Sequence, residues 1–346
     1  MSAASHFRDG ARLASTEPLA VQRMPGLRDP DSMSPRRNPA NPISVRVPAS
    51  TSNLGPGFDF LGLALSLHLE ARCTGPSSNA GHEFARLDGT AAAWPRGGEN
   101  LLLRAFDLAA SRLGLPARGF CFEVRSEIPI ARGLGSSGAA VAAGLRLASA
   151  LSPRKAGVDE LLAWGLELEG HPDNSSAALL GGCTLSVPVP GGKLRVVRQD
   201  VHPDLAFALA WPSQGLPTPI ARAALPAQVP FRDAVENPRR LALLLEGLRR
   251  ADPELLALGG EDRLHVPYRL PLIPGAAKAL VAAREAGAWL ATISGSGSGL
   301  IAIGARGRVE SISVAMVDAL RAVDSRAEGR VAELVQPGPD YPRANP

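Results

Sequence analysis

The first half of the chain contains segments with two different spacings of apolar residues. Strict alternation of apolar and polar side chains predicts half-buried strands, whereas apolar residues three and four apart predict amphipathic helices. These patterns predict strands over residues 43–47, 63–69, 120–125, 183–189 and 194–197, and helices over residues 99–114, 138–151 and 158–169. Residues 190–192 (PGG) suit the turn of a hairpin between the last two strands. The first ordered unit therefore mixes strands and helices.

The second half arranges the same elements in another order. Strands are predicted over residues 205–211, 289–293, 300–303 and 331–335, and helices over 237–250 and 309–323, with an extra helix near 275–286. This β-α-β-β-α-β order is that of a ferredoxin-like domain. Residues 1–42 contain six prolines and no periodicity, so we expect a disordered leader there. The expected fold is α/β (α+β), with domains over residues 43–200 and 201–346.

Composition narrows the class of protein. The 346 residues are 45% hydrophobic, which is enough for a sizeable core, and the net charge of +4 is too small and dispersed to indicate a nucleic-acid partner. Cys73, Cys121 and Cys183 lie far apart in apolar segments, a pattern typical of reduced thiols in a cytoplasmic protein. No apolar run reaches the length of a membrane span, and the first residues lack a secretory signal.

A glycine-rich loop, residues 133–138 (GLGSSG), joins the strand at 120–125 to the helix that follows. Free amides and the helix dipole at such a helix start form an anion site, commonly for phosphate. A Rossmann site is disfavoured because residues 128–132 separate the glycines from the strand. A Walker A loop is excluded because Gly192-Lys193, the only Gly-Lys pair, precedes Leu194. A purely structural glycine turn remains an alternative.

Three further stretches are candidates for ligand binding. Residues 48–59 (PASTSNLGPGFD) could be a surface loop, or a substrate loop that offers the Asn53 amide and the Asp59 carboxylate. Residues 169–176 carry Glu169, His171, Asp173 and Asn174; one imidazole beside a proline makes an unusual metal site, and Asp or Asn could instead cap a helix that begins at Ser175. Residues 294–299 (SGSGSG) form a second glycine loop, either a flexible turn or part of a shared ligand site.

These segments together resemble one family. Residues 48–62, 129–139 and 294–299 are similar to the three motifs of the GHMP small-molecule kinases, and residues 48–59, 169–174, 218–226 and 262–269 are similar to the homoserine kinases within that group. The resemblance implies transfer of the ATP γ-phosphoryl group to the side-chain hydroxyl of L-homoserine, a step towards threonine. It also implies a ribosomal-protein-S5-like N-terminal domain, a ferredoxin-like C-terminal domain and a homodimer.

The resemblance further implies a role for each matching residue. Arg222 and Arg269 would bind the substrate carboxylate, Asp59 its ammonium group with His171 at the same end, Asn53 and Asn174 its hydroxyl, and Thr218 would also contact it. The triphosphate would lie on the loop formed by Pro129, Ile130, Ala131, Arg132, Gly133, Leu134, Gly135, Ser136, Ser137, Gly138 and Ala139. Ser137 and Glu169 would hold Mg²⁺, which prefers oxygen ligands.

The chemical step has no evident general base. Asn174 stands where related kinases often have Asp, and an amide cannot accept a proton, so we expect catalysis by positioning and electrostatic stabilisation. The catalytic group would comprise Asn53, Glu169, Asp173 and Asn174, with Asp173 orienting its neighbours or simply capping a helix. Ser298 replaces a usual proline and residues 175–177 (SSA) replace Val-Ala-Pro, which predicts local changes, including a looser third loop.

Three other functions remain open at this point. The chain could be a GHMP kinase for another alcohol, such as mevalonate or a diphosphocytidyl sugar alcohol. It could also be a ligand sensor that has lost catalysis, although the glycine loop and Glu169 are intact. A dehydrogenase would instead bind NAD.

Overall fold

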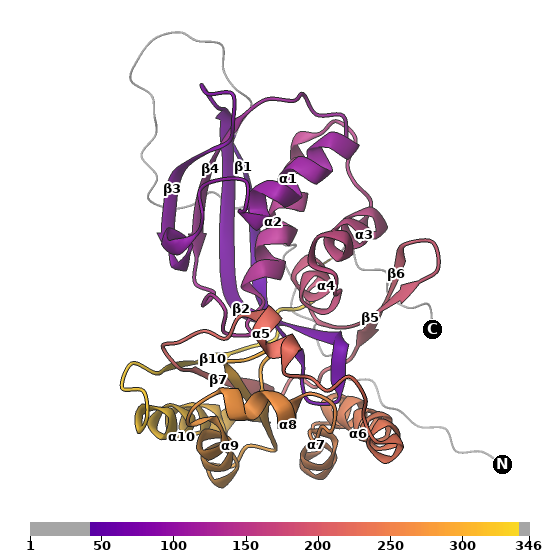
Figure 1. The fold of residues 1–346 in the computed structure, drawn as a ribbon, viewed down its shortest axis with the longest axis vertical. Coiled ribbons are helices and arrows are strands. Elements are labelled where there is room, and N and C mark those ends of the chain that lie inside the picture. The colour runs from indigo at the N-terminus through magenta and orange to yellow at the C-terminus, as the bar shows by residue number, and fades with distance from the viewer. Residues whose placement is uncertain (1–41, 339–346) are drawn as a thin grey trace, which may run out of the picture.

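The first sheet has six strands (Figure 1). The computed structural model describes residues 42–338, so the predicted leader lies outside the described residues except for Pro42. β2 lies at the centre of the order β3-β4-β2-β5-β6 and also pairs with β1; only β3 and β4 run parallel. The strands are β1 (Ile43–Asn53), β2 (Gly57–Pro76), β3 (Glu83–Gly89), β4 (Phe120–Ser126), β5 (Cys183–Val189) and β6 (Lys193–Gln199).

Four helices pack on one face of this sheet: α1 (Leu101–Arg112), α2 (Ser136–Leu151), α3 (Val158–Glu169) and α4 (Asp173–Leu180), with a short 3₁₀ turn at Thr90–Ala93. The side chain of Asn100 caps α1 by accepting bonds from the amides of Leu102 and Leu103. A methyl group on Gly144 of α2 would lie 2.2 Å from the carbonyl oxygen of Leu102. The small residues predicted in α2 therefore let the two helices approach closely.

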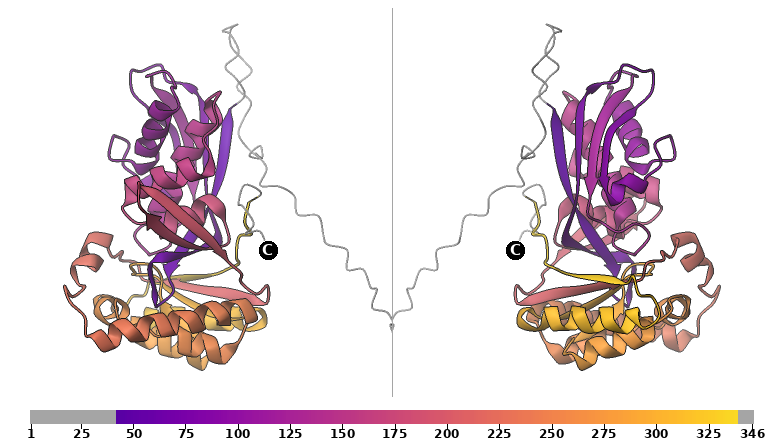
Figure 2. Two further views of the ribbon diagram at one scale, coloured as in Figure 1. Left: turned by 90° about the vertical axis from the view of Figure 1, so that its right-hand side faces the viewer. Right: turned by 90° about the vertical axis from the view of Figure 1, so that its left-hand side faces the viewer.

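The second sheet has the strand order β10-β7-β9-β8, all antiparallel, as in a ferredoxin-like domain. Figure 2 shows this sheet above a layer of helices. Its strands are β7 (Leu205–Trp211), β8 (Leu290–Ile293), β9 (Leu300–Ala305) and β10 (Glu328–Ala332). The associated helices are α5 (Thr218–Ala223), α6 (Phe231–Arg250), α7 (Pro253–Gly259), α8 (Val266–Arg269), α9 (Ala276–Glu285) and α10 (Val309–Arg321), with 3₁₀ turns at Leu270–Leu272 and Arg306–Arg308.

The predicted ferredoxin-like order is confirmed, but its first helix was assigned wrongly. α9, expected to be extra, packs with α10 through Ala276, Ala279 and Leu280 on one face of the second sheet. α6, expected to fill that place, packs instead with α7 and buries Leu244 and Leu248 in the larger core. An apolar helical stripe does not reveal which sheet face it will cover, so periodicity alone could not separate these two helices.

β7 joins the two halves of the molecule. Its alanines, such as Ala208, face the α9–α10 side, whereas Phe207 and Leu209 belong to the core shared with the first sheet. All seven residues of β7 are buried. The segment after β10 extends this connection, because the amide of Val335 donates to the carbonyl of Ala64 in β2 at 3.1 Å. The last described residues thus leave the second sheet and pack against the first.

Several predicted boundaries change in the structure. β1 does not end at residue 47 but continues to Asn53, so much of the expected loop at 48–59 is strand, because Ala49–Ser52 pair with β2. α6 begins at Phe231 and contains Pro238, and β10 ends at Ala332. α4 begins at Asp173, with Pro172 as its N-cap, so the expected cap before Ser175 is wrong. Across residues 42–338, no helix is both long and apolar enough to cross a membrane.

Candidate active site

A cavity of about 340 Å³ brings most of the predicted site residues together. Its walls come from the β1–β2 turn, the start of α2, the start of α4, and the segments that carry α5 and α8. The predicted residues along it are Asn53, Asp59, Ile130–Ser137, His171, Asp173, Asn174, Thr218, Arg222 and Arg269. Pro129, Gly138, Ala139 and Glu169 do not line this cavity.

The glycine loop and the start of α2 form an anion site. Gly133 and Gly135 have φ angles of 63° and 68°, and Gly135 is the N-cap of α2. A methyl group on Gly133 would lie 1.8 Å from the carbonyl oxygen of Ser294, and one on Gly135 would lie 2.0 Å from Oγ of Ser50. Only glycine fits both the backbone angle and the approach. The first amides of α2 have no acceptor within the helix and carry the positive end of its dipole.

The second glycine loop packs directly against the first. Oγ of Ser294 donates to the carbonyl of Gly133 at 2.7 Å and lies 2.8 Å from Oγ1 of Thr51. The amide of Gly295 donates to the carbonyl of Ser52 at 3.1 Å. Ser298, where a looser loop was expected, is buried, and its hydroxyl donates to the carbonyl of Gln214 at 2.7 Å. Both loops are therefore held in place by β1.

The two predicted amides hold backbone and hydroxyl groups around the cavity. Oδ1 of Asn53 accepts from the amide of Asp59 at 3.0 Å, and its Nδ2 donates to the carbonyl of Gly295 at 2.9 Å. Oδ1 of Asn174 accepts from Ser50 at 3.0 Å, and its Nδ2 donates to Ser52 at 3.1 Å. Asn53, with a φ of 69°, thus shapes the β1–β2 turn, while Asn174 connects α4 to β1.

His171 and Asp173 form a hydrogen-bonded pair on the cavity wall, in which Asp173 is buried and His171 is partly exposed. Nδ1 of His171 lies 2.7 Å from Oδ1 of Asp173, which also accepts from the amide of Asn174 at 2.9 Å. Burial alone would lower the pKa of His171, but the hydrogen bond and charge of Asp173 and the charge of Glu169 raise it. Burial would likewise raise the pKa of Asp173, but His171 and further hydrogen bonds lower it. The structure thus favours the charged form of both groups.

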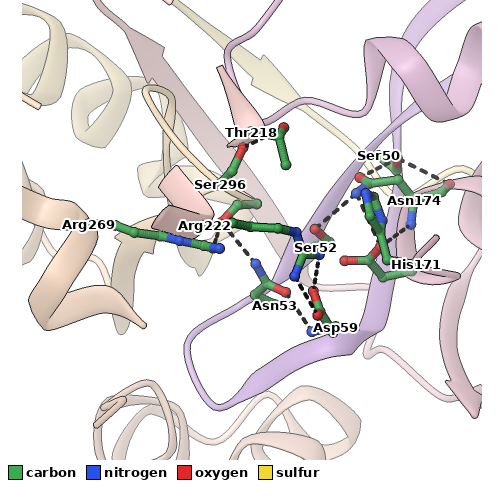
Figure 3. Close-up of polar contacts among 12 residues, drawn as sticks. Ser50, Ser52, Asn53, Asp59, His171, Asn174, Thr218, Arg222, Arg269 and Ser296 are labelled. Carbon is green, nitrogen blue, oxygen red and sulfur yellow. Dashed lines mark hydrogen bonds and ion pairs between the residues drawn. The ribbon is translucent and has the colours of Figure 1, made fainter. Parts of the chain in front are cut away.

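Asp59 and Arg222 form a two-pronged ion pair across the cavity. The guanidinium donates to Oδ1 at 2.7 Å and to Oδ2 at 2.9 Å, and the pKa of Arg222 is raised by its hydrogen bonds to Asp59. Figure 3 shows Arg222 reaching Asp59, with Arg269 beyond it and His171 and Asn174 on the opposite side. Arg269 is 2% exposed, and burial and the nearby charge of Arg222 lower its pKa. The cavity therefore contains both charge signs at one end.

Glu169 lies just behind the start of α2. The residue is partly exposed, but its Oε2 atom is buried and has no hydrogen-bond partner among residues 42–338. The hydroxyls of Ser137 and Ser175 hydrogen-bond to the carboxylate, yet burial dominates and raises the pKa of Glu169 to about 7. An incompletely paired carboxylate next to a hydroxyl suits a hard cation. Within the described residues, no group of three or more His, Cys, Asp or Glu side chains is arranged around a metal position.

Further residues line the cavity without an individual role assigned from the sequence. Ser52, Gly295 and Ser296 belong to the stretches expected to bind ligand, whereas sequence reasoning missed Trp94, Pro95, Glu99, Asn100, Leu101 and Ala140. Asn100 carries a visible signal, since an Asn before an apolar helix is a typical N-cap, but capping does not itself indicate a ligand. Trp94 follows no motif, and its position becomes evident only in the structure, where it lines the same cavity as Ala140 of α2.

Comparison with known proteins assigns the class. Residues 100–182 match the GHMP kinases N terminal domain and residues 244–322 match the GHMP kinases C terminal domain. Two sheets of this topology with a glycine-loop anion site between them define a GHMP kinase, and the chain belongs to that family. The predicted two-domain fold is thereby confirmed.

The relatives identify the branch. The chain is 41% identical to a homoserine kinase of Prochlorococcus marinus (strain MIT 9303), over 82% of this chain and 91% of the relative. It is 42% identical to a homoserine kinase of Moorella thermoacetica, over 80% of this chain and 91% of the relative. A solved homoserine kinase structure from Cytophaga hutchinsonii superposes with a TM-score of 0.76 at 28% identity, covering 88% of this chain and 98% of the other. Within its family, the chain therefore belongs with the homoserine kinases.

Proposed function

We propose that this protein transfers the γ-phosphoryl group of ATP to the side-chain hydroxyl of L-homoserine and so forms O-phospho-L-homoserine for threonine biosynthesis. The observation that carries the proposal is one cavity with a helix-start anion site at one side and Asp59, Arg222 and Arg269 at the other. The relatives of the chain support the same reaction.

The charged end of the cavity suits an amino-acid substrate. Homoserine carries an ammonium and a carboxylate group, which match Asp59 and the two arginines in sign. In the structure Asp59 and Arg222 form an ion pair with each other. A bound zwitterion would replace this internal pair with two intermolecular ones, because a guanidinium binds both oxygens of a carboxylate. An alcohol without charges would leave the Asp59–Arg222 pair with no function in binding.

ATP would place its phosphates at the glycine loop and the start of α2. Ser137 and Glu169 would hold Mg²⁺ through their side-chain oxygens, and Glu169 offers a buried oxygen that has no hydrogen-bond partner in the described part of the chain. When bound, the metal ion neutralises negative charge on the phosphates. The helix dipole and the loop amides act on the same charge.

Catalysis would proceed without a protein base next to the substrate hydroxyl. Asn174 cannot accept a proton, and its amide is fixed by Ser50 and Ser52. Oδ1 of Asp173 also holds Asn174, by accepting a hydrogen bond from its backbone amide. Such rigid polar groups suit a loose phosphoryl transition state, which depends on alignment and charge stabilisation. Asp173 would thus orient both His171 and Asn174.

A coupled ADP-release assay tests the reaction, with Mg·ATP and L-homoserine, L-serine, L-threonine, mevalonate and galactose as acceptors. We expect turnover with homoserine alone. The variant Arg269→Ala should raise the KM for homoserine far more than the KM for ATP, because Arg269 lies at the charged end of the cavity. Turnover with mevalonate and not homoserine would contradict the proposal, and equal effects on both KM values would remove Arg269 from the substrate site.

Three broader expectations accompany this function. We propose a homodimer by analogy with the family, a cytoplasmic location, and a domain boundary between residues 200 and 201. The free thiols of Cys73, Cys121 and Cys183 support the location, since reducing conditions keep thiols unpaired. Size-exclusion chromatography with light scattering would test the dimer.

A further inference from the structure

Phe58 lies directly before Asp59 at the beginning of β2, and its ring contacts three charged or aromatic groups. The guanidinium carbon of Arg269 lies 5.0 Å from the ring centroid, and that of Arg222 lies 5.7 Å from it. The ring of His265 lies 5.0 Å away, centroid to centroid, and is tilted by 32°. One side chain thus touches both arginines at the charged end of the cavity.

The two arginines need such a neighbour because of where they lie. Arg269 is 2% exposed, and its protein partners are the carbonyls of Ala221 and Gly295, at 3.2 and 3.4 Å, and Nδ1 of His265 at 3.4 Å. None of these three partners carries a negative charge when His265 is neutral. Burial and then the nearby charge of Arg222 lower the pKa of Arg269, against the smaller opposing effect of the carboxylates around it. Two like charges are therefore held side by side, that of Arg269 buried and that of Arg222 partly exposed.

An aromatic ring face attracts cations, since its π-electrons carry negative charge. The attraction grows as water is removed from the contact. His265 supports the ring from within: it is fully buried, and its Nε2 donates to the carbonyl of Gly55 at 2.8 Å, which leaves Nδ1 free to accept from Arg269. The turn that carries Asp59 is in this way connected to Arg269.

We propose that Phe58 is a specificity-determining positioning residue whose ring holds Arg222 and Arg269 ready for a substrate carboxylate. This inference rests on the proposed function, because it assumes that the arginines bind the carboxylate of homoserine. Phe58 contacts the two arginines, and we assign it no contact with the reacting atoms. Its loss should weaken the binding of carboxylate-bearing ligands and leave the ATP side of the cavity unchanged.

The strand offers a matched control two residues away. Phe60 also lies on β2, but it packs against the large apolar core. Phe58→Leu removes the π-face and keeps an apolar side chain, and Phe58→Tyr keeps the ring. Phe60→Leu makes the same change at a ring that no guanidinium of residues 42–338 contacts. Thermal unfolding of each variant would show that it is folded at the assay temperature.

Steady-state kinetics with homoserine and ATP, and inhibition by L-2-aminobutyrate, test the proposal. L-2-aminobutyrate has the ammonium and carboxylate groups but no hydroxyl. In Phe58→Leu we expect the KM for homoserine and the Ki for L-2-aminobutyrate to rise together by roughly tenfold, the size of a buried cation–π contact. The KM for ATP and kcat should stay within about twofold of the wild-type values, a change too small for a lost contact of this kind. Phe58→Tyr should restore binding, and Phe60→Leu should leave it unchanged.

Two outcomes would overturn the inference about Phe58. One is a Phe58→Leu variant in which kcat and both KM values change by similar factors, as expected for a general loss of structure. The other is a Phe58→Tyr variant as impaired as Phe58→Leu. A wild-type enzyme that phosphorylates another alcohol and not homoserine would instead refute the proposed function, and the inference with it.

Discussion

Removing the negative charge of Glu169 should stabilise the ligand-free protein at alkaline pH while it impairs catalysis. The pKa of this buried carboxyl rises from its ordinary value of 4.5 to about 7. Because one pH unit of pKa difference corresponds to about 1.4 kcal/mol, ionising Glu169 costs the folded state about 3 kcal/mol. The native protein holds this proton more tightly than the unfolded chain, so the cost is absent below pH 4.5 and grows as the pH rises through 7.

The variant Glu169→Gln removes the titration and keeps the size of the side chain. Oε2 of Glu169 has no hydrogen-bond partner within residues 42–338, so the amide that replaces it would add a pH-independent difference in stability between the two proteins. The pH dependence of the difference isolates the charge. Between pH 5 and pH 8 the free energy of unfolding of Glu169→Gln should increase by about 2–3 kcal/mol relative to that of the wild type.

Urea unfolding at a series of pH values, without nucleotide or metal, measures this quantity. Mg·ATP should then stabilise the wild type more than the variant, because the bound cation would compensate the carboxylate. ADP release by the variant should be strongly reduced. A stability difference that stays constant from pH 5 to pH 8 would refute the reasoning, since Glu169 would then titrate at its ordinary pKa.

Two further changes test the anion site and the charged end of the cavity. Gly135→Ala should raise the KM for ATP and destabilise the fold more than Gly114→Ala does. The methyl group added at Gly135 would lie 2.0 Å from Oγ of Ser50, whereas Gly114 has a similar φ of 69° and open space around it. Gly114→Ala should lower the free energy of unfolding by only about 1–2 kcal/mol, and equal losses for the two variants in thermal unfolding would argue against the close approach at Gly135. Asp59→Asn should raise the KM for homoserine and cost the fold less than about 1 kcal/mol, since its pair with Arg222 is partly exposed; an unchanged KM would exclude Asp59 from the substrate site.

Local patterns predicted the elements whose signals are continuous in the chain. α3 is confirmed at Val158–Glu169, where an apolar stripe ends before Gly170 with a φ of 75°. The second half of β1 was missed because Ser50–Ser52 look like a polar loop. Thr51 is buried by its contact with Ser294, which lies 243 positions further along the chain. No local pattern contains that contact.

The same limit applies to the site. The resemblance brought Asp59 and Arg222 into one hypothesis, but as separate contacts to a ligand. Their pairing with each other depends on the β1–β2 turn and α5 meeting in space, which spacing along the chain does not reveal. The glycine loop was predictable because its strand, loop and helix follow one another in the chain, so their arrangement depends mainly on local sequence.

The segment after β10 constrains how the site can admit its ligands. The amide of Val335 donates to the carbonyl of Ala64, and the carbonyl of Val335 accepts from the amide of Gly182. The segment after β10 is therefore hydrogen-bonded both to β2 and to the residue before β5. Any wide rotation of one sheet away from the other would have to break these hydrogen bonds and expose the core around β7. We therefore expect the two sheets to keep their relative position when ligands bind. Ligands would then enter the cavity as side chains at its opening, such as Asp59 and Arg222, exchange each other for the ligand.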